Sequence, residues 1–195
     1  MAHFLPQAAI FDLDGTLTDS MYVWDHIPEE LVRRFGGHPA PDLSHTLRAM
    51  SSPQAIDYLI RTYHLPASSQ QLMEAMEDLA DREYRDRVPL KQGVRPLLER
   101  LGVWPFFSFV LSATQYGPKT RPDLYLEAAR QLGAAPQYTL VFEDALHAAQ
   151  TAVQAGFQVV GVYDAFSAED QPALKEICRW HLKQLDDPSF LAQLG

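Results

Sequence analysis

Short apolar runs alternate with amphipathic helical segments over most of the chain. Runs of this kind, each bounded by turn residues, predict strands at 8–11, 107–111, 138–142 and 157–162. Helical spacing of apolar residues predicts helices at 93–101, 122–132, 145–155 and 172–182, with the remaining residues to Gly195 on the surface. Strands that alternate with helices of this length indicate an α/β fold built on a doubly wound parallel sheet.

One block departs from this alternation and is helical throughout. It runs from Leu17 to Val88, directly after the first strand. Apolar stripes and helix-start signals within it predict successive helices at 21–35 and 43–50, from Pro53, and from Ser68 or Ser69. A helical block of this size inside an α/β pattern indicates a second, inserted domain, with 1–17 and 89–195 forming the core and 18–88 the insertion.

Composition narrows the function classes. The chain has 195 residues, 47% of them hydrophobic, and a net charge of −9, which disfavours nucleic acid or an anionic membrane as partner. Its single cysteine, Cys178, excludes an internal disulfide and indicates a cytoplasmic protein. No segment is apolar for long enough to span a membrane, and the first strand begins too early for a signal peptide.

Two carboxylates follow the first strand, in the stretch Phe11-Asp12-Leu13-Asp14-Gly15-Thr16. Asp12 and Asp14 begin with a common direction because residues two apart in a strand point to the same side. Crowded carboxylates repel, and Mg²⁺ with its oxygen ligands suits such a pair. The simplest alternative is an ordinary acidic turn. A calcium loop is excluded, because Leu17 and Val23 occupy the positions that need glycine and glutamate.

Two later segments add chemistry of the same kind. Lys119 stands just before a proline-started helix, where it can neutralise a phosphate and crowded carboxylates together, although an isolated lysine there is commonly a solvated surface charge. Glu143 and Asp144 end an apolar strand and precede a helix, which suits either metal ligation or a simple helix cap. Ligands of parallel sheets bind beyond the carboxyl ends of the strands, where these residues are predicted to lie.

These three segments together resemble the motifs of the haloacid dehalogenase (HAD) superfamily, in the branch of phosphoglycolate phosphatase and β-phosphoglucomutase. The resemblance implies a Rossmannoid core with a helical cap at 18–88. It implies that Asp12 is the nucleophile and that Asp14 is the general acid/base, with its backbone carbonyl on the metal. It further implies that Lys119 binds phosphate and that Asp12, Asp14, Glu143 and Asp144 form an Mg²⁺ site.

The chain departs from the family pattern after the helix at 93–101. Family members have a second strand there that ends in a phosphate-binding serine or threonine, and this strand with its return helix is missing. Parallel neighbours cannot be joined without such a crossover. We expect the strand at 107–111 to close up beside 8–11 in a four-stranded sheet, so that Ser112 or Thr114 approaches Asp12 and binds phosphate.

The sequence therefore predicts a cytoplasmic, Mg²⁺-dependent phosphatase that hydrolyses a small phosphorylated metabolite through an aspartyl phosphate. An alternative is a HAD-like protein with weak or no catalysis, because the second-motif strand is missing. A sugar-phosphate mutase is disfavoured because Trp24 and Ser52 occupy the positions of its histidine and arginine. A phospho-acceptor receiver domain is disfavoured by the helical insertion. The sequence determines neither the substrate nor the oligomeric state.

Overall fold

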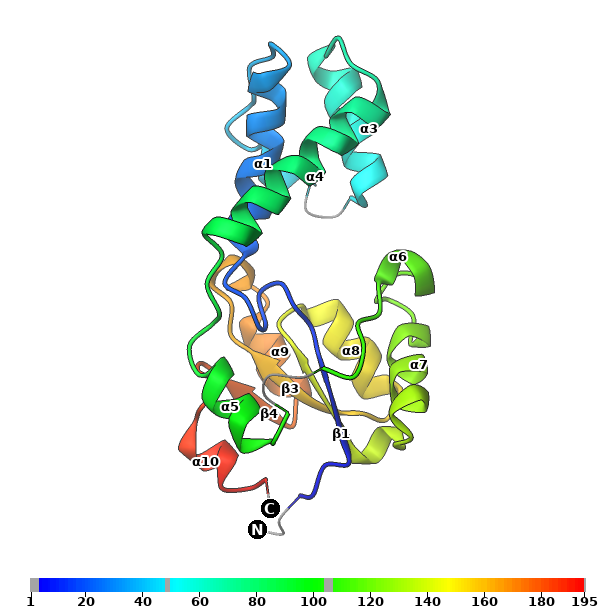
Figure 1. Ribbon diagram of the computed structural model, residues 1–195, viewed down its shortest axis with the longest axis vertical. Helices are drawn as coiled ribbons and strands as arrows, with labels where there is room; N and C mark the ends of the chain where they lie inside the picture. The colour runs from blue at the N-terminus through cyan, green and yellow to red at the C-terminus, as the bar shows by residue number, and fades with distance from the viewer. Residues whose placement is uncertain (1–3, 48–49, 104–106, 195) are drawn as a thin grey trace. The chain divides into compact units, whose positions relative to one another are not determined.

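The computed structural model describes residues 4–47, 50–103 and 107–194 of an α/β protein, and so confirms the predicted fold class (Figure 1). Its described residues form two compact units, Met1–Asp19 with Leu90–Gly195, and Ser20–Pro89. No helix within the described ranges is long and apolar enough to cross a membrane. The α-helices and strands, in chain order, are β1 (Ala8–Phe11), α1 (Met21–Arg34), α2 (Leu43–Leu47), α3 (Ser52–Tyr63), α4 (Ser69–Asp86), α5 (Val94–Arg100), α6 (Ala113–Tyr116), α7 (Asp123–Leu132), β2 (Thr139–Glu143), α8 (Leu146–Gln154), β3 (Gln158–Val162), α9 (Gln171–Ile177), β4 (Trp180–Leu182) and α10 (Pro188–Leu191).

The first unit is built on a parallel sheet of four strands in the order β1-β2-β3-β4. β2 lies inside the sheet, and all five of its residues are buried. This explains its continuous apolar run, because a strand of a parallel sheet is covered on both faces. The register pairs Phe11 with Phe142 and Glu143 with Gly161, so neighbouring strands end at nearly the same level.

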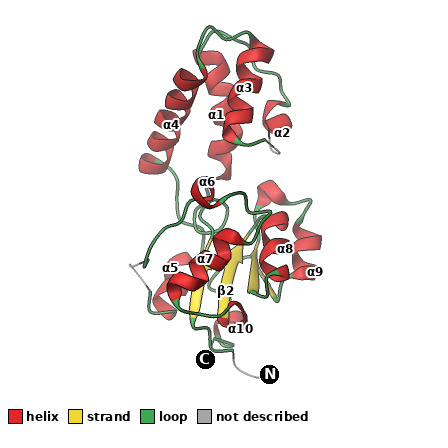
Figure 2. Cartoon of the chain, turned by 90° about the vertical axis from the view of Figure 1, so that its right-hand side faces the viewer, coloured by secondary structure: helices red, strands yellow, loops and turns green. Residues whose placement is uncertain are grey.

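Alternate residues along the strands pack into two separate hydrophobic cores. Leu140 and Phe142 of β2 join one cluster with α5 and the C-terminal segment around α10. Val141, between them, joins the other cluster, with α7, α8 and α9. Figures 1 and 2 show these two sets of helices on opposite faces of the sheet. The two-residue period of the strands therefore builds the three-layer arrangement.

The predicted strand at 107–111 is wrong. The structure has no strand there, and β1 pairs with β2 alone within the described part of the chain. The Phe107 ring instead packs edge-on against Phe11, with ring centroids 6.1 Å apart, while Val110 is 90% exposed. A short apolar run does not by itself specify backbone pairing, and this one is not covered on both faces. The fourth strand of the sheet comes from the C-terminal region instead.

The predicted helix at 172–182 is wrong in its second half. α9 ends at Ile177, and β4 then pairs with β3, with Trp180 opposite Val160. This pairing supplies a neighbour to β3, and such tertiary contacts override local helical spacing. The chain after β4 is also not a surface segment, because Leu185, Phe190 and Leu194 are buried in the core on the α5 face.

The second unit, Ser20–Pro89, has its own hydrophobic core. Buried residues of α1, α2, α3 and α4 form one cluster that includes Val23, Ile27, Leu31, Leu59 and Leu72. Serines start two of the helices: Ser51 and Ser68 form capping boxes with the glutamine three residues later. The helical block is therefore a compact unit, and its assignment as a cap domain stays a prediction.

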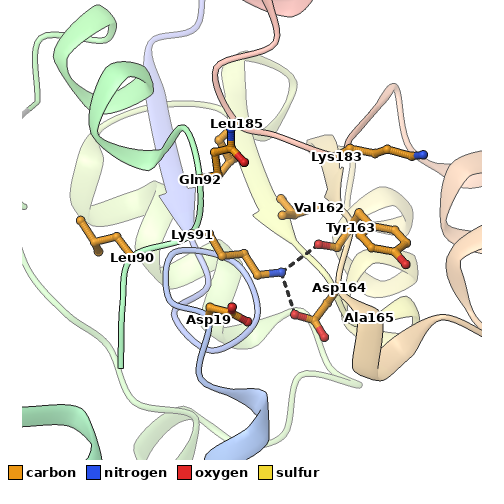
Figure 3. A pocket seen from close by; sticks show the side chains of 10 residues that line it. All are labelled: Asp19, Leu90, Lys91, Gln92, Val162, Tyr163, Asp164, Ala165, Lys183 and Leu185. Carbon is orange, nitrogen blue, oxygen red and sulfur yellow. Dashed lines mark hydrogen bonds and ion pairs between the residues drawn. The ribbon is translucent and has the colours of Figure 1, made fainter. Parts of the chain in front are cut away.

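A buried ion pair ties the chain segment after the helical unit to the end of β3. The Lys91 amine lies 2.7 Å from an Asp164 carboxylate oxygen and donates to the Tyr163 carbonyl at 2.8 Å, at the edge of a hollow of about 240 Å³ (Figure 3). The Lys91 and Asp164 side chains are only 13% and 2% exposed. The Lys91 backbone N–H also donates to the Leu17 carbonyl, so Lys91 contacts both chain segments that lead to the helical unit.

Lys91→Met should lower the free energy of unfolding by about 2–4 kcal/mol, because it leaves the buried Asp164 charge unpaired. Lys183→Met is the matched control. Lys183 lines the same hollow but is exposed, so its loss should change stability by less than about 0.5 kcal/mol. Urea unfolding of both variants measures the difference, and equal effects would contradict the structural role of the ion pair.

Candidate active site

Three carboxylates meet where β1 and β2 end. Asp12 follows β1, and its N–H donates to the Phe142 carbonyl at 3.0 Å, which continues the pairing of the two strands. Glu143 is the last residue of β2, and Asp144 follows it. Oxygen atoms of Asp12, Glu143 and Asp144 lie within 4.8 Å of one another. The β1–β2 register thus brings together residues that are more than 130 positions apart in the chain.

One lysine faces this cluster. Lys119 lies in the loop between α6 and α7, and its amine donates to Asp12 Oδ1 and, at 2.8 Å, to Glu143 Oε2. Burial by itself would lower the pKa of Lys119, but the charges of Glu143 and Asp12 outweigh it and raise the pKa. Lys119 therefore stays protonated, and it bridges the carboxylates of two neighbouring strands.

The turn after β1 supports Asp144. Thr16 is fully buried, and its hydroxyl donates to Asp144 Oδ1 at 3.0 Å. Gly15 has a φ of +82°, and a Cβ atom added there would lie 2.5 Å from Asp144 Oδ2. Glycine is thus required both for the backbone conformation and for the space that the Asp144 carboxylate occupies. The Asp-x-Asp-Gly-Thr stretch includes Thr16, but its contact with Asp144 depends on a residue 128 positions away and is not visible in the sequence.

Burial and mutual repulsion raise two of the carboxylate pKa values. The pKa of Asp12 rises to about 7, because burial and the neighbouring Glu143 charge outweigh the attraction of Lys119. The pKa of Asp144 rises to about 8, again through burial first and then through Glu143 and Asp12. Among the described residues one lysine faces three carboxylates, so their full ionisation would leave excess negative charge. An all-oxygen donor set with this charge fits a hard divalent cation such as Mg²⁺.

Tyr125 is a site residue that sequence reasoning missed. It lies in the first turn of α7, is 2% exposed, and donates its hydroxyl to Glu143 Oε2 at 3.1 Å. Burial and then the Glu143 charge raise the pKa of this phenol, so it remains a neutral donor. The only sequence signal was a tyrosine six residues after Lys119, at a position that helical spacing assigns to the core.

The structure does not place the Asp14 carboxylate in this cluster, and it does not test the predicted hydroxyls. Asp14 is half-buried, and its backbone forms an isolated β-bridge with that of Thr18. Its carboxylate does not belong to the cluster of Asp12, Glu143 and Asp144. Ser112 is exposed and immediately precedes α6, where its carbonyl accepts a hydrogen bond from the Gln115 N–H. The Thr114 side chain lies outside the described part of the structure. The roles of Asp14, Ser112 and Thr114 stay predictions.

Comparison with known proteins gives the family context of this geometry. Residues 90–162 match the family model of haloacid dehalogenase-like hydrolases, a range that contains Lys119, Glu143 and Asp144. Hexitol phosphatase A from Escherichia coli is 27% identical, with 86% of this chain and 87% of that protein covered. Fructose-1-phosphate phosphatase from the same organism is 24% identical, with 78% and 94% covered.

A solved structure has the same fold. The HAD family IA hydrolase (variant 3) from Entamoeba histolytica superposes with a TM-score of 0.77 over 92% of this chain and 93% of that chain, at 20% identity. The shared fold, the family-model match and the similarity to phosphatases over most of the chain agree with one another. The chain is therefore similar to haloacid dehalogenase-like hydrolases over residues 90–162, and to two phosphatases over most of its length.

Proposed function

We propose that this protein is a Mg²⁺-dependent phosphatase that hydrolyses a phosphorylated sugar or sugar alcohol through an aspartyl phosphate on Asp12. The observation that carries the proposal is the meeting of Asp12, Glu143, Asp144 and Lys119 at one edge of the sheet. The relatives named above, a hexitol phosphatase and a fructose-1-phosphate phosphatase, support the substrate class.

Each residue of the site has a chemical role in this proposal. A carboxylate oxygen of Asp12 attacks phosphorus, forming the aspartyl phosphate, as Asp14 gives a proton to the departing substrate oxygen. Asp14 then takes a proton from the water that hydrolyses the aspartyl phosphate. Lys119 holds the equatorial phosphate oxygens and offsets their charge.

Asp12, Glu143 and Asp144 would hold the Mg²⁺ ion, together with the backbone carbonyl of Asp14. When bound, Mg²⁺ offsets the charge that builds up on the phosphate oxygens. The crowding of the three carboxylates supports this assignment, because a dication would relieve the repulsion that raises the pKa values of Asp12 and Asp144.

The helical unit is proposed as the cap domain, and the protein as cytoplasmic. The chain enters Ser20–Pro89 once and leaves it once, as an inserted domain does. The single cysteine supports a reducing compartment. A mutase remains disfavoured, because the Trp24 indole N–H donates to the Tyr84 hydroxyl at 3.2 Å and offers no group for proton transfer.

A second candidate is a metal-binding HAD-like protein with weak or no turnover. The lack of a strand at 107–111 favours it, because the hydroxyl of the second family motif would come from the end of such a strand. Losing a donor to the transferring phosphate costs about 2–4 kcal/mol of transition-state stabilisation, by analogy with oxyanion donors. This candidate would bind Mg²⁺ but release phosphate slowly or not at all from every member of a broad substrate panel.

Phosphate release from hexose and hexitol phosphates should require Mg²⁺, vanish in EDTA, and fall by about 10³-fold or more in Asp12→Asn, which removes the attacking charge. Asp81→Asn is the control, because Asp81 is exposed on α4 and forms a surface ion pair with Arg85. A colorimetric phosphate assay over a panel of substrates measures all three effects. Undiminished activity in Asp12→Asn, or in EDTA, would refute the mechanism.

Asp144→Asn should stabilise the metal-free protein by about 1–3 kcal/mol at pH 8. The fold raises the pKa of Asp144, so the wild-type protein is stabilised when this carboxyl binds a proton. That contribution is complete below the pKa of the unfolded chain, near 4, and is lost as the pH rises through the folded pKa of about 8. The asparagine carries no charge and keeps an oxygen that can accept from Thr16. Urea unfolding in EDTA at several pH values measures this.

The gain in Asp144→Asn should disappear below about pH 3, where the carboxyl is protonated in both the folded and the unfolded state. With saturating Mg²⁺ the order should reverse, because the wild type gains binding energy that the variant has lost. A variant no more stable than the wild type at pH 8 in EDTA would contradict the proposed charge crowding.

A further inference from the structure

Tyr125 is anchored in the core while its hydroxyl reaches the carboxylate cluster. Its ring belongs to the hydrophobic core between the sheet and helices α7, α8 and α9, and packs at 6.2 Å from the Phe157 ring. Its hydroxyl donates to Glu143 Oε2 at 3.1 Å, and Glu143 is itself 1% exposed. A side chain fixed by packing thus holds a second side chain that is closed off from solvent.

The two oxygens of Glu143 have unequal partners. Oε2 accepts from the Lys119 amine at 2.8 Å and from the Tyr125 hydroxyl. Oε1 accepts only the Ala145 backbone N–H among the hydrogen bonds found in the described residues, at 3.3 Å. The last torsion of a glutamate is broad, so the carboxylate can rotate unless its partners fix it. Two donors on Oε2 hold the carboxylate in one orientation, and Oε1 keeps a lone pair with which it can bind a cation.

We propose that Tyr125 is a positioning residue for the metal site: it pins Oε2 of Glu143 so that Oε1 is presented to the cation. This inference rests on the proposed function, because it takes Glu143 as a ligand of Mg²⁺. Mutation of a residue that orients a metal ligand commonly lowers metal affinity or activity by about 10- to 100-fold.

A phenol suits this position better than the other donors would. A second lysine or an arginine could also pin Oε2, but its positive charge would repel the dication that the cluster is proposed to bind. A phenylalanine would fill the same space and leave Oε2 with Lys119 alone. Tyrosine orients Glu143 and leaves the net charge of the site unchanged.

The test compares Tyr125→Phe with Tyr138→Phe, using Mg²⁺ alone as the ligand. Tyr125→Phe keeps the ring and removes only the hydroxyl, while Tyr138 is 46% exposed and lies away from the cluster on the segment before β2. We expect isothermal titration calorimetry to show about 10-fold weaker Mg²⁺ binding for Tyr125→Phe. Tyr138→Phe should bind Mg²⁺ as the wild type does.

Melting curves in EDTA and in Mg²⁺ separate positioning from a merely structural role. A structural role would lower the Tm of Tyr125→Phe equally in both conditions. Positioning predicts that the rise in Tm on adding a fixed, subsaturating amount of Mg²⁺ becomes smaller than in the wild type. It also predicts that a large excess of Mg²⁺ restores kcat to within about threefold of the wild type, with KM for the substrate unchanged.

Two outcomes would overturn the inference, and they can be told apart. If the wild type binds Mg²⁺ and Tyr125→Phe binds it within twofold as tightly, the positioning role is wrong and the proposed function stands. If the wild type does not bind Mg²⁺, the proposed metal site fails, and the role of Tyr125 fails with it. Weakened binding in Tyr125→Phe alone, with Tyr138→Phe normal, supports the inference.

Discussion

Repulsion among Asp12, Glu143 and Asp144 is the constraint on which the site depends. The β1–β2 register brings these carboxylates together, because Phe11 lies opposite Phe142 and the residues that follow both are acidic. A single lysine cannot balance three carboxylates, so burial and repulsion raise the pKa values of Asp12 and Asp144. Such a cluster lowers the free energy of unfolding of the metal-free protein, and a cation that binds there would raise it again.

The surrounding residues hold this unfavourable arrangement in place. Thr16 donates to Asp144, Tyr125 to Glu143, and Lys119 bridges Asp12 and Glu143. Each donor comes from a different segment: the turn after β1, helix α7 and the loop before α7. Because these segments are anchored in the cores on either face of the sheet, the carboxylates cannot move apart to relieve their repulsion.

The sheet around the site is asymmetric. β1 carries Asp12, yet it pairs with β2 alone within the described residues, while the side of β3 away from β2 is covered by β4. Phe107 contributes a ring contact to Phe11 of β1 but no backbone pairing. At the site itself, Lys119 contacts the ends of both strands, because its amine donates to Asp12 after β1 and to Glu143 of β2.

The sequence by its local pattern predicted the helical block, the strands at 8–11, 138–142 and 157–162, and the acidic residues at the ends of the first two. These features are local: strand runs, helix caps and the Asp-x-Asp-Gly turn each act over a few residues. Tertiary structure alone decided that 107–111 is not a strand, that Trp180–Leu182 is one, and that Thr16 and Tyr125 reach the carboxylates. Those outcomes depend on which segment pairs with a sheet edge and which side chain meets a buried charge, and contacts between distant residues settle both.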